Sequence, residues 1–362
     1  MRIAFVGCGN VLGAYLAAAE RLRQQHAATV VALCGPERRR ARALELGIPS
    51  FSTDYAEVLA RPDIDAVVIL TPMREHAAMT SAALEAGKHV LVEKPFATTL
   101  EEGRELIALA ARSPGLLVCA PFTVLSQTFQ AIARRVRNGD LGKVVAARGR
   151  YCWAGPDWAD WFYRPGGGAL FDLGVYNLTS LTGWLGPVQR VSAMAGAAVP
   201  ERLINGRSVL VEAEDNAQLL LDFGESCYAT ILTGFCVQQY RGPGLELFGT
   251  EGTVYMLGDD WDPDGYELWQ NRAGCWQCFK ETQPDWPWTD GLGHLVECIR
   301  EQRRPLTTPE HALHVLEVML EAKAAARDGI TRSIQSTFTL PEFESSTAGV
   351  AAHRVHDRTR SE

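Results

Sequence analysis

Five apolar segments alternate with helical patterns over the first 122 residues, and this alternation constrains the fold more than any other feature. The apolar segments are RIAFVG, TVVALC, AVVILTP, HVLVEKP and GLLVCAP, at residues 2–7, 29–34, 66–72, 89–95 and 115–121. Between them, apolar side chains recur at helical spacing in residues 10–25, 36–47, 75–87 and 99–111. Such an alternation indicates a parallel sheet covered by helices on both faces, so residues 1–122 are predicted to form an α/β domain.

The pattern changes after Phe122. A long amphipathic helix is predicted at 128–142, and strands with period-two patterning are predicted at 144–151, 218–224, 226–235, 245–250 and 252–257. Two more helical patterns occupy 290–302 and 310–329. Adjacent strands joined by turns favour a large, mostly antiparallel sheet. We therefore expect a second, α+β domain at 123–345, followed by a polar tail at 346–362.

The composition excludes several classes of partner. The chain of 362 residues has a formal net charge of −8 and no basic block longer than Arg38-Arg39-Arg40, which argues against nucleic acid and membrane surfaces. No apolar run reaches the roughly 20 residues that span a bilayer. Nine scattered cysteines are typical of free thiols in a reducing cytoplasm. Cys275 and Cys278 lack a second CxxC partner, so they are interpreted as ordinary thiols and no metal site is expected.

Gly7-Cys8-Gly9 follows the first strand and opens the first helix, where a dinucleotide pyrophosphate needs a tight turn and free N–H groups. Gly7 and Gly9 satisfy the first two glycine positions of GxGxxG. The third position is Leu12, and Gly13 comes one residue late. The placement between a strand and a helix makes this a nucleotide-binding loop; the alternative is a plain strand-to-helix turn.

The second strand ends at Gly35, where an acid would bind the ribose hydroxyls of NAD. Arginines follow at 38, 39 and 40. Loss of the carboxylate and gain of guanidinium groups favour a 2′-phosphate, so NADP is preferred over NAD as the expected cofactor. The alternative is that the arginines form a solvated helix face.

Two segments carry candidate chemistry. Val92-Glu93-Lys94-Pro95 ends a strand at the carboxyl edge of the predicted sheet, where ligands of such sheets bind. GGGALFDLGVYN at 166–177 places Asp172 and Tyr176 four residues apart, on one face if residues 171–186 are helical. A lysine, a carboxylate and a phenol together make a proton-transfer site; separately, Asp172 could be a helix cap and Tyr176 a core aromatic.

The order of the glycine loop, Thr71-Pro72 with His76, Glu93-Lys94-Pro95 and GGGALFDLGVY resembles the glucose–fructose oxidoreductase/inositol dehydrogenase (Gfo/Idh/MocA) family over nearly the whole chain. The resemblance implies a Rossmann domain, a C-terminal domain with a large open sheet, NAD or NADP, and a sugar-like substrate. It also implies homodimers or homotetramers, commonly built through the open sheet, and a cis Lys94–Pro95 bond. Many members carry histidine where this chain has Tyr176. The tyrosine resembles the branch of glucose–fructose oxidoreductase and dimeric dihydrodiol dehydrogenase.

The expected cytosolic enzyme is an NAD(P)-dependent oxidoreductase that interconverts a secondary alcohol and a carbonyl. Catalysis is assigned to Lys94, Asp172 and Tyr176. Nucleotide binding is assigned to Gly7, Gly9, Asn10, Val11, Leu12, Gly35, Arg38, Arg39, Thr71, Pro72, His76, Glu93 and Lys94. Substrate binding is assigned to Lys94, Asp172 and Tyr176 together with Trp161 and Arg164, which lie in an aromatic loop that could equally be an interface patch.

Two other functions stay open from the sequence. A tightly held nucleotide could be used transiently to labilise a glycosidic bond, with no net redox change. A non-catalytic nucleotide-binding sensor of the same fold is the other, although the presence of Lys94, Asp172 and Tyr176 argues against it.

Overall fold

The computed structural model describes residues 1–280, 286–343 and 353–354, and the chain folds into two compact units. The first unit comprises Met1–Phe122 and Pro287–Leu316; the second begins with Thr123–Trp286 and continues from Glu317. Of the predicted polar tail, residues 346–352 and 355–362 lie outside the described residues. The two units are taken separately below.

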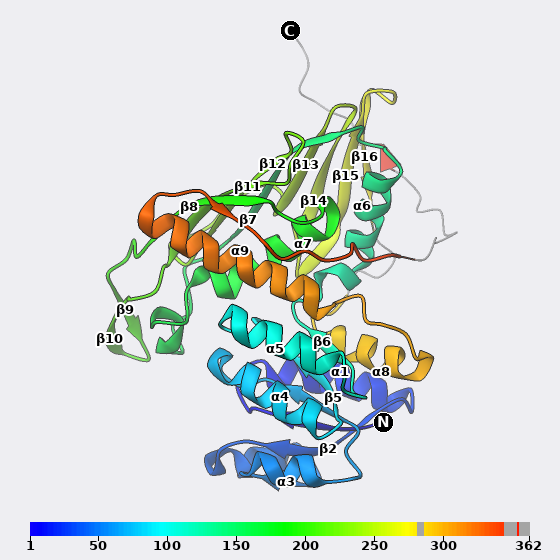
Figure 1. Ribbon diagram of the computed structural model, residues 1–362, viewed down its shortest axis with the longest axis vertical. Helices are drawn as coiled ribbons and strands as arrows, with labels where there is room; N and C mark the ends of the chain where they lie inside the picture. Colours follow the sequence, from blue (N-terminus) through cyan, green and yellow to red (C-terminus); the bar gives the residue numbers. More distant parts are fainter. Residues whose placement is uncertain (281–285, 344–352, 355–362) are drawn as a thin grey trace. The chain divides into compact units, whose positions relative to one another are not determined.

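The first unit contains a six-stranded, wholly parallel sheet in the order β3-β2-β1-β4-β5-β6, which confirms the predicted α/β architecture (Figure 1). Its strands are β1 (Arg2–Val6), β2 (Thr29–Cys34), β3 (Phe51–Ser52), β4 (Ala66–Ile69), β5 (His89–Val92) and β6 (Leu117–Cys119). All four residues of β4 are buried, as the continuous apolar pattern requires of a strand covered on both faces.

The helices of the first unit follow the predicted segments, except for a short helix at residues 55–60 that the sequence did not predict. They are α1 (Leu12–Gln24), α2 (Arg40–Glu45) after the 3-10 turn η1 (Glu37–Arg39), α3 (Tyr55–Ala60), α4 (His76–Glu85) after the 3-10 turn η2 (Met73–Glu75), α5 (Leu100–Ala110) and α8 (Gly291–Glu301). Thr99 and Glu102 form a capping box that fixes the start of α5. In contrast, α1 begins after Val11 without a side-chain cap.

The second unit is built on a ten-stranded sheet in the order β17-β8-β11-β12-β7-β13-β14-β15-β16-β18. Only the β12–β7 pair is parallel, so the sheet is mostly antiparallel, as predicted. The strands are β7 (Val144–Cys152), β8 (Arg190–Gly196), β11 (Asn216–Asp222), β12 (Tyr228–Gly234), β13 (Leu245–Gly249), β14 (Gly252–Asp259), β15 (Asp262–Gln270), β16 (Cys275–Phe279), β17 (Arg332–Ser333) and β18 (His353–Arg354), with β9 (Glu201–Ile204) and β10 (Arg207–Leu210) forming a separate hairpin.

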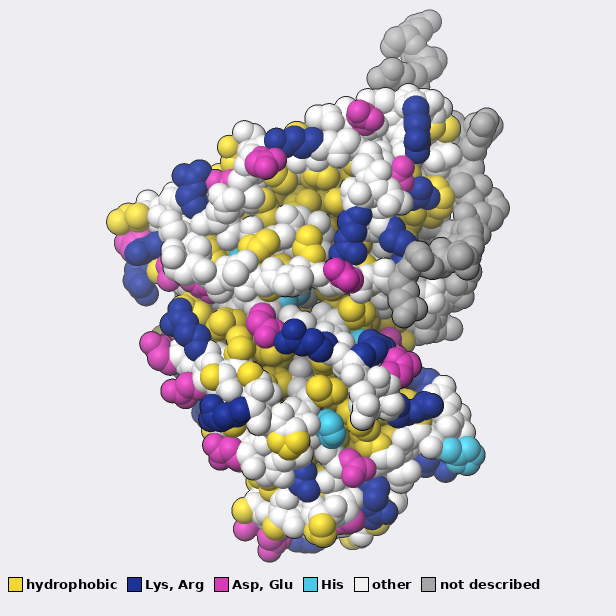
Figure 2. Space-filling view, turned by 45° about the vertical axis from the view of Figure 1, so that its right-hand side comes forward, with side chains coloured by type: hydrophobic (Ala, Val, Ile, Leu, Met, Phe, Trp, Pro, Cys, Tyr) yellow, Lys and Arg dark blue, Asp and Glu magenta, His cyan; other side chains and the backbone are white. Residues whose placement is uncertain are grey.

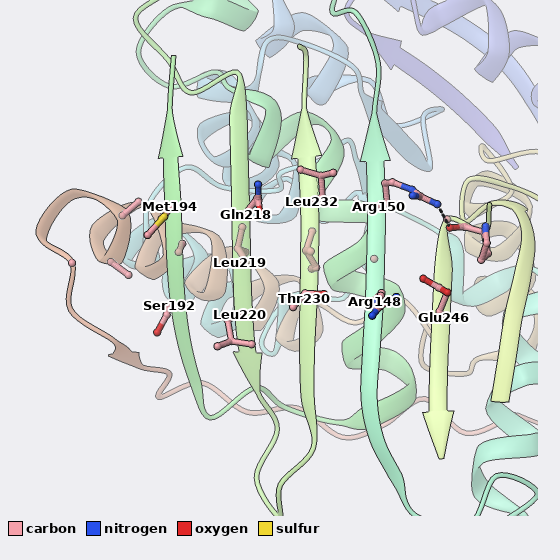
Figure 3. Close-up of a pocket in the computed structure, with 18 of the residues that line it drawn as sticks. Arg148, Arg150, Ser192, Met194, Gln218, Leu219, Leu220, Thr230, Leu232 and Glu246 are labelled. Carbon is pink, nitrogen blue, oxygen red and sulfur yellow. Dashed lines mark hydrogen bonds between the residues drawn. The ribbon is translucent and has the colours of Figure 1, made fainter. Parts of the chain in front are cut away.

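Helices cover one face of this sheet. They are α6 (Gln127–Arg137), α7 (Val175–Leu185) and the part of the long α9 (Pro309–Asp328) that belongs to this unit from Glu317 on, with 3-10 turns η3 (Thr123–Leu125) and η4 (Asp160–Tyr163). Gly149 of β7 packs directly on Asn177 of α7, since a Cβ added to Gly149 would lie 3.0 Å from the Asn177 Cβ. Because side chains alternate along a strand, Arg148 and Arg150 of β7 belong to the opposite, open face (Figure 3).

Candidate active site

Four strands of the first unit end at the same level. Val6 pairs with Cys34 and with Ile69, and Ile69 pairs with Val92. The residues that follow each strand are therefore brought together at the carboxyl edge of the sheet. These are the glycine loop, Gly35, Thr71 and Lys94, so the sequence-predicted nucleotide residues converge at the edge where open α/β sheets bind ligands.

Gly7 occupies a backbone conformation that requires glycine. Its φ is +107°, and an added Cβ would lie 2.5 Å from the carbonyl oxygen of Leu70. Its N–H donates to the Cys34 carbonyl at 2.9 Å, which fixes the turn against β2. The uncapped start of α1 follows, and the first N–H groups of a helix are a ready anion site. The residues present thus fit a dinucleotide pyrophosphate.

Leu12 takes the third glycine position of the loop, and its side chain is buried. Gly13 is exposed, and a Cβ there would meet no atom within 4 Å. The departure from GxGxxG is therefore accommodated by packing Leu12 into the core. Asn10 is exposed and Val11 half-buried in the same loop.

Thr71 provides a polar group that the described protein atoms do not satisfy. Its Oγ1 is buried and has no hydrogen-bond partner among the described residues. An unsatisfied buried hydroxyl is costly, so a polar ligand at this strand end would remove that cost. Pro72 beside it is exposed.

The arginines after β2 are not equivalent. Arg40 is held by Glu37, with bonds of 2.6 and 2.9 Å, and its guanidinium lies 4.8 Å from the Phe51 ring centre. Arg38 and Arg39 are exposed. Burial raises the pKa of the Cys8 thiol in the glycine loop, and the Arg39 cation opposes that rise, which places Arg39 near the loop. Arg38 and Arg39 are thus the arginines available to a ligand, and Arg40 is committed to its neighbours.

His76 is buried at the start of α4 and holds two strand ends. Its Nδ1 lies 2.7 Å from the Pro95 carbonyl oxygen and its Nε2 lies 2.8 Å from the Thr71 carbonyl oxygen. Burial lowers the pKa of His76, so the ring is neutral and donates to one of these carbonyls at a time. The structure therefore places His76 behind the edge, where it positions the backbone on both sides of the nucleotide residues.

Glu93 is buried beneath the strand end, and Lys94 is half-buried. The Glu93 carboxylate accepts from the Tyr15 hydroxyl at 2.7 Å and from the Lys94 N–H at 3.1 Å. The Lys94–Pro95 bond is cis, as expected from the resemblance. Tyr15 is a contributor that the sequence did not suggest, because nothing local links it to a residue 78 positions away.

In the second unit, Asp172 lies in a π-helical turn, η5 (Leu170–Gly174), which runs directly into α7. The sequence predicted a helix over 171–186 without this change of pitch. Asp172 and Tyr176 are both half-buried, whereas Leu173 and Val175 are buried. Both candidate side chains are thus partly accessible, while their immediate neighbours Leu173 and Val175 face the core.

The glycines before η5 are held by an ion pair that the sequence did not suggest. Lys323 of α9 lies 3.1 Å from the Glu214 carboxylate and donates to the Gly167 carbonyl at 3.3 Å. Its Nζ also lies 4.0 Å from the ring centre of Phe171. A Cβ on Gly168, whose φ is +107°, would collide with the Glu214 carboxylate. Glycine at 168 therefore lets the carboxylate approach the backbone that leads to Asp172.

The aromatic loop packs largely on itself. Trp161 stacks on Phe162 with ring centres 3.7 Å apart, and Trp153 stacks on Trp158. Phe162 is buried, while Trp161 is 38% exposed. Arg164 forms a 2.8 Å ion pair with Glu212. Trp161 is therefore open to a ligand or a partner, and Arg164 is already engaged with a carboxylate.

The described residues contain no group of three or more His, Cys, Asp or Glu side chains placed to hold a metal ion. Cys275 and Cys278 are half-buried free thiols on β16. Within the described ranges, no helix has the length and apolar character needed to cross a bilayer. Positive and negative side chains are interspersed over the face seen in Figure 2.

Comparison with known proteins places this site in a family. Residues 1–120 match the model described as oxidoreductase family, NAD-binding Rossmann fold, and residues 129–255 match the Gfo/Idh/MocA C-terminal domain. An uncharacterized oxidoreductase of Synechocystis sp. is 30% identical over 299 residues, covering 75% of this chain and 80% of the relative. The scyllo-inositol 2-dehydrogenase (NAD⁺) of Bacillus subtilis is 25% identical over 348 residues, covering 91% and 95%.

A solved structure shares the fold. Levoglucosan dehydrogenase in complex with NADH superimposes with a TM-score of 0.82 at 19% identity, covering 93% of this chain and 99% of that one. Both family models match in chain order, and the parallel sheet with its glycine loop precedes the large open sheet. The chain therefore belongs to the Gfo/Idh/MocA family of oxidoreductases and has its NAD-binding Rossmann fold.

Proposed function

We propose that the protein interconverts a secondary alcohol and a carbonyl on a sugar-like, polyhydroxylated substrate. The observation that carries this proposal is that Asp172 in η5 and Tyr176 in α7 are both partly accessible, in a chain whose β5 is followed two residues later by Lys94. The family relatives named above act, by their names, on scyllo-inositol and levoglucosan. Both compounds are rings that carry several hydroxyl groups, which supports a polyol substrate here.

Each residue has a separate role in the proposed reaction. The bound nicotinamide ring supplies or accepts the hydride. Tyr176 takes the hydroxyl proton during oxidation and returns it during reduction. Lys94 supplies a fixed positive charge to the reacting oxygen, where negative charge develops. Asp172 accepts a hydrogen bond from a substrate hydroxyl and so orients the ring.

The proposed cofactor preference is NADP. The exposed guanidinium groups of Arg38 and Arg39 are available to a 2′-phosphate, while Gly35 brings no carboxylate to repel it. The proposed location is the cytoplasm, which suits free thiols such as Cys8 and Cys236.

A homodimer or homotetramer is proposed to form through the open sheet face. The face carries a hollow of about 660 Å³, lined by strands β8, β11, β12, β7 and β13 and, at one side, by the end of α9 with Gly329 and Ile330 (Figure 3). Met194 and Leu220 on it are 83% and 50% exposed, more than apolar side chains on a covered sheet. Light scattering should report an oligomer for the wild type and a smaller species for Leu220→Arg. A wild-type monomer at working concentration argues against the assembly.

To test the function, the protein is mixed with NAD or NADP and one compound from a panel of four: scyllo-inositol, levoglucosan, D-glucose or D-xylose. The change in nicotinamide absorbance is then measured for each compound. Net absorbance change with a panel member supports the oxidoreductase. Cleavage of a glycoside without net absorbance change supports the redox-neutral alternative, and nucleotide binding without turnover supports a sensor. Lys94→Ala should lower the rate at least ~100-fold with little change in nucleotide affinity.

A further inference from the structure

Tyr151 of β7 lies against the residues assigned to proton transfer, although no motif points to it. Its ring meets that of Tyr176 edge-on, with centres 5.6 Å apart and planes at 72°. On its other side Trp261, in the turn between β14 and β15, stacks on Tyr151 at 6.2 Å with planes at 17°. Tyr151 is therefore held between Tyr176 and Trp261 with a fixed ring orientation.

The position follows from the strand. Gly149 and Tyr151 are two residues apart, so both point to the face covered by α7. Gly149 meets Asn177, the residue after Tyr176, and this close contact sets β7 against the start of α7. The strand therefore delivers the Tyr151 ring to the Tyr176 end of the helix.

The Tyr151 hydroxyl is left without an internal partner. Among the described residues no hydrogen bond to its oxygen is formed, and the side chain is only half-buried. The indole N–H of neighbouring Trp261 is also without a partner there. Burial raises the pKa of Tyr151 and the Asp172 carboxylate adds to the rise, so the phenol keeps its proton and stands near Asp172. A phenol that never ionises is a hydrogen-bond donor and not a base.

We propose that Tyr151 is a substrate-binding residue that donates a hydrogen bond to a hydroxyl next to the reacting carbon, beside the one bound by Asp172. This assignment rests on the proposed oxidoreductase function. It selects compounds with neighbouring hydroxyl groups over simple secondary alcohols. The two phenols then have different roles: Tyr176 exchanges the proton, and Tyr151 binds the substrate ring.

The test compares Tyr151→Phe with wild type on the panel member that is turned over best and on its single-deoxy analogues. With the full polyol, Tyr151→Phe should lower kcat/KM about tenfold, mainly through KM, the loss expected for one hydrogen bond. With the analogue that lacks the bound hydroxyl, the two proteins should be equal. The pH–rate profile of Tyr151→Phe should match that of the wild type.

Tyr255→Phe is the matched control, because Tyr255 also stacks on a tryptophan of the same sheet, Trp276, with ring centres 4.9 Å apart. It should behave as the wild type. The assignment of Tyr151 is overturned if Tyr151→Phe lowers kcat/KM by the same factor for the polyol and for every deoxy analogue, or does not lower it at all. Neither result would contradict the proposed oxidoreductase activity. If the wild type turns over no panel member, the proposed function and this assignment both fall.

Discussion

The hydroxyl of Tyr15 donates a 2.7 Å hydrogen bond to the buried carboxylate of Glu93. Tyr15 lies on the first helix and Glu93 immediately precedes Lys94, so one bond joins the nucleotide helix to the strand end that presents the lysine. Glu93 also accepts from the Lys94 N–H, which makes its carboxylate part of the backbone geometry at that point.

Removing the Tyr15 hydroxyl should therefore destabilise the first unit. In Tyr15→Phe the buried carboxylate loses a donor, and bonds to charged groups are worth about 2 kcal/mol. Urea unfolding should show that loss in free energy. Tyr55→Phe is the control, because its hydroxyl donates to a neutral carbonyl, that of Met79, and should cost about 1 kcal/mol. Equal losses in the two variants would show that the carboxylate is not relying on Tyr15.

Tyr176→Phe should keep the fold and lose the proton relay. The rate should fall about 100-fold or more, the range usual for a general acid–base group, with little change in unfolding free energy. Tyr176→His should recover more activity than Tyr176→Phe. It should also move the pH dependence of the rate toward an imidazole pKa of about 6.5. If Tyr176→Phe is fully active, the Tyr176 ring only packs against its neighbours, and another group transfers the proton.

Arg39→Ala and Arg38→Ala should each erase a preference for NADP. Titration at fixed salt should show tighter binding of NADP than of NAD by the wild type, and about tenfold weaker NADP binding by either variant, with NAD unchanged. Arg40→Ala is the control, since Glu37 and Phe51 already hold that guanidinium. If the wild type binds NAD as tightly as NADP, the preference is absent and both arginines belong to a solvated helix face.

His294 should make the first unit less stable in acid. The Leu306 N–H donates to its Nε2 at 2.9 Å, so that nitrogen must be unprotonated in the folded state. Burial, with the Arg303 cation adding to it, lowers the pKa of His294 to about 4. The unfolded chain, with a pKa near 6.5, binds the proton first, so stability is complete above pH 6.5. It should fall by roughly 3 kcal/mol as the pH drops toward 4.

His294→Gln keeps an oxygen that can accept from Leu306 but removes the titration. Its unfolding free energy should change less between pH 6.5 and 4 than that of the wild type, while His26→Asn, at an exposed position, should follow the wild-type curve. Buried His311 contributes equally to every curve. If the unfolding free energies of His294→Gln and the wild type change equally with pH, His294 is not a cause of the acid sensitivity.

The parts of the fold that could be predicted are segments in which apolar residues form a continuous run or recur at a regular spacing. Five of the six parallel strands before Phe122 are continuous apolar runs and appear where predicted, whereas the two-residue β3 was not predicted. β15 was missed because it begins Asp262-Pro263-Asp264-Gly265, a sequence typical of a turn. β16 is a five-residue CWQCF segment without the apolar–polar alternation that predicts a strand.

The site divides in the same way. Lys94, Asp172 and Tyr176 stand in recognisable motifs and are half-buried in the structure, and the roles predicted for them stay predictions. Tyr15, Tyr151 and Lys323 have no local signal, because each matters through a contact made at long range in the chain. Helical spacing and strand alternation relate residues that are close in the sequence. Each of these three residues instead contacts a partner that is distant in the sequence and close only in the folded chain.

The π-helical turn η5 holds one residue more per turn than an α-helix does. Deleting one residue between Leu170 and Gly174 would restore α-helical pitch and rotate the segment before the deletion by about 100° around the axis of α7. Asp172 and Tyr176 would stay on one face, because side chains three or four residues apart in an α-helix are neighbours. The extra residue therefore sets the direction from which the glycines at 166–168 enter the helix, and a relative that lost it would keep the carboxylate and the phenol but present its glycine loop differently.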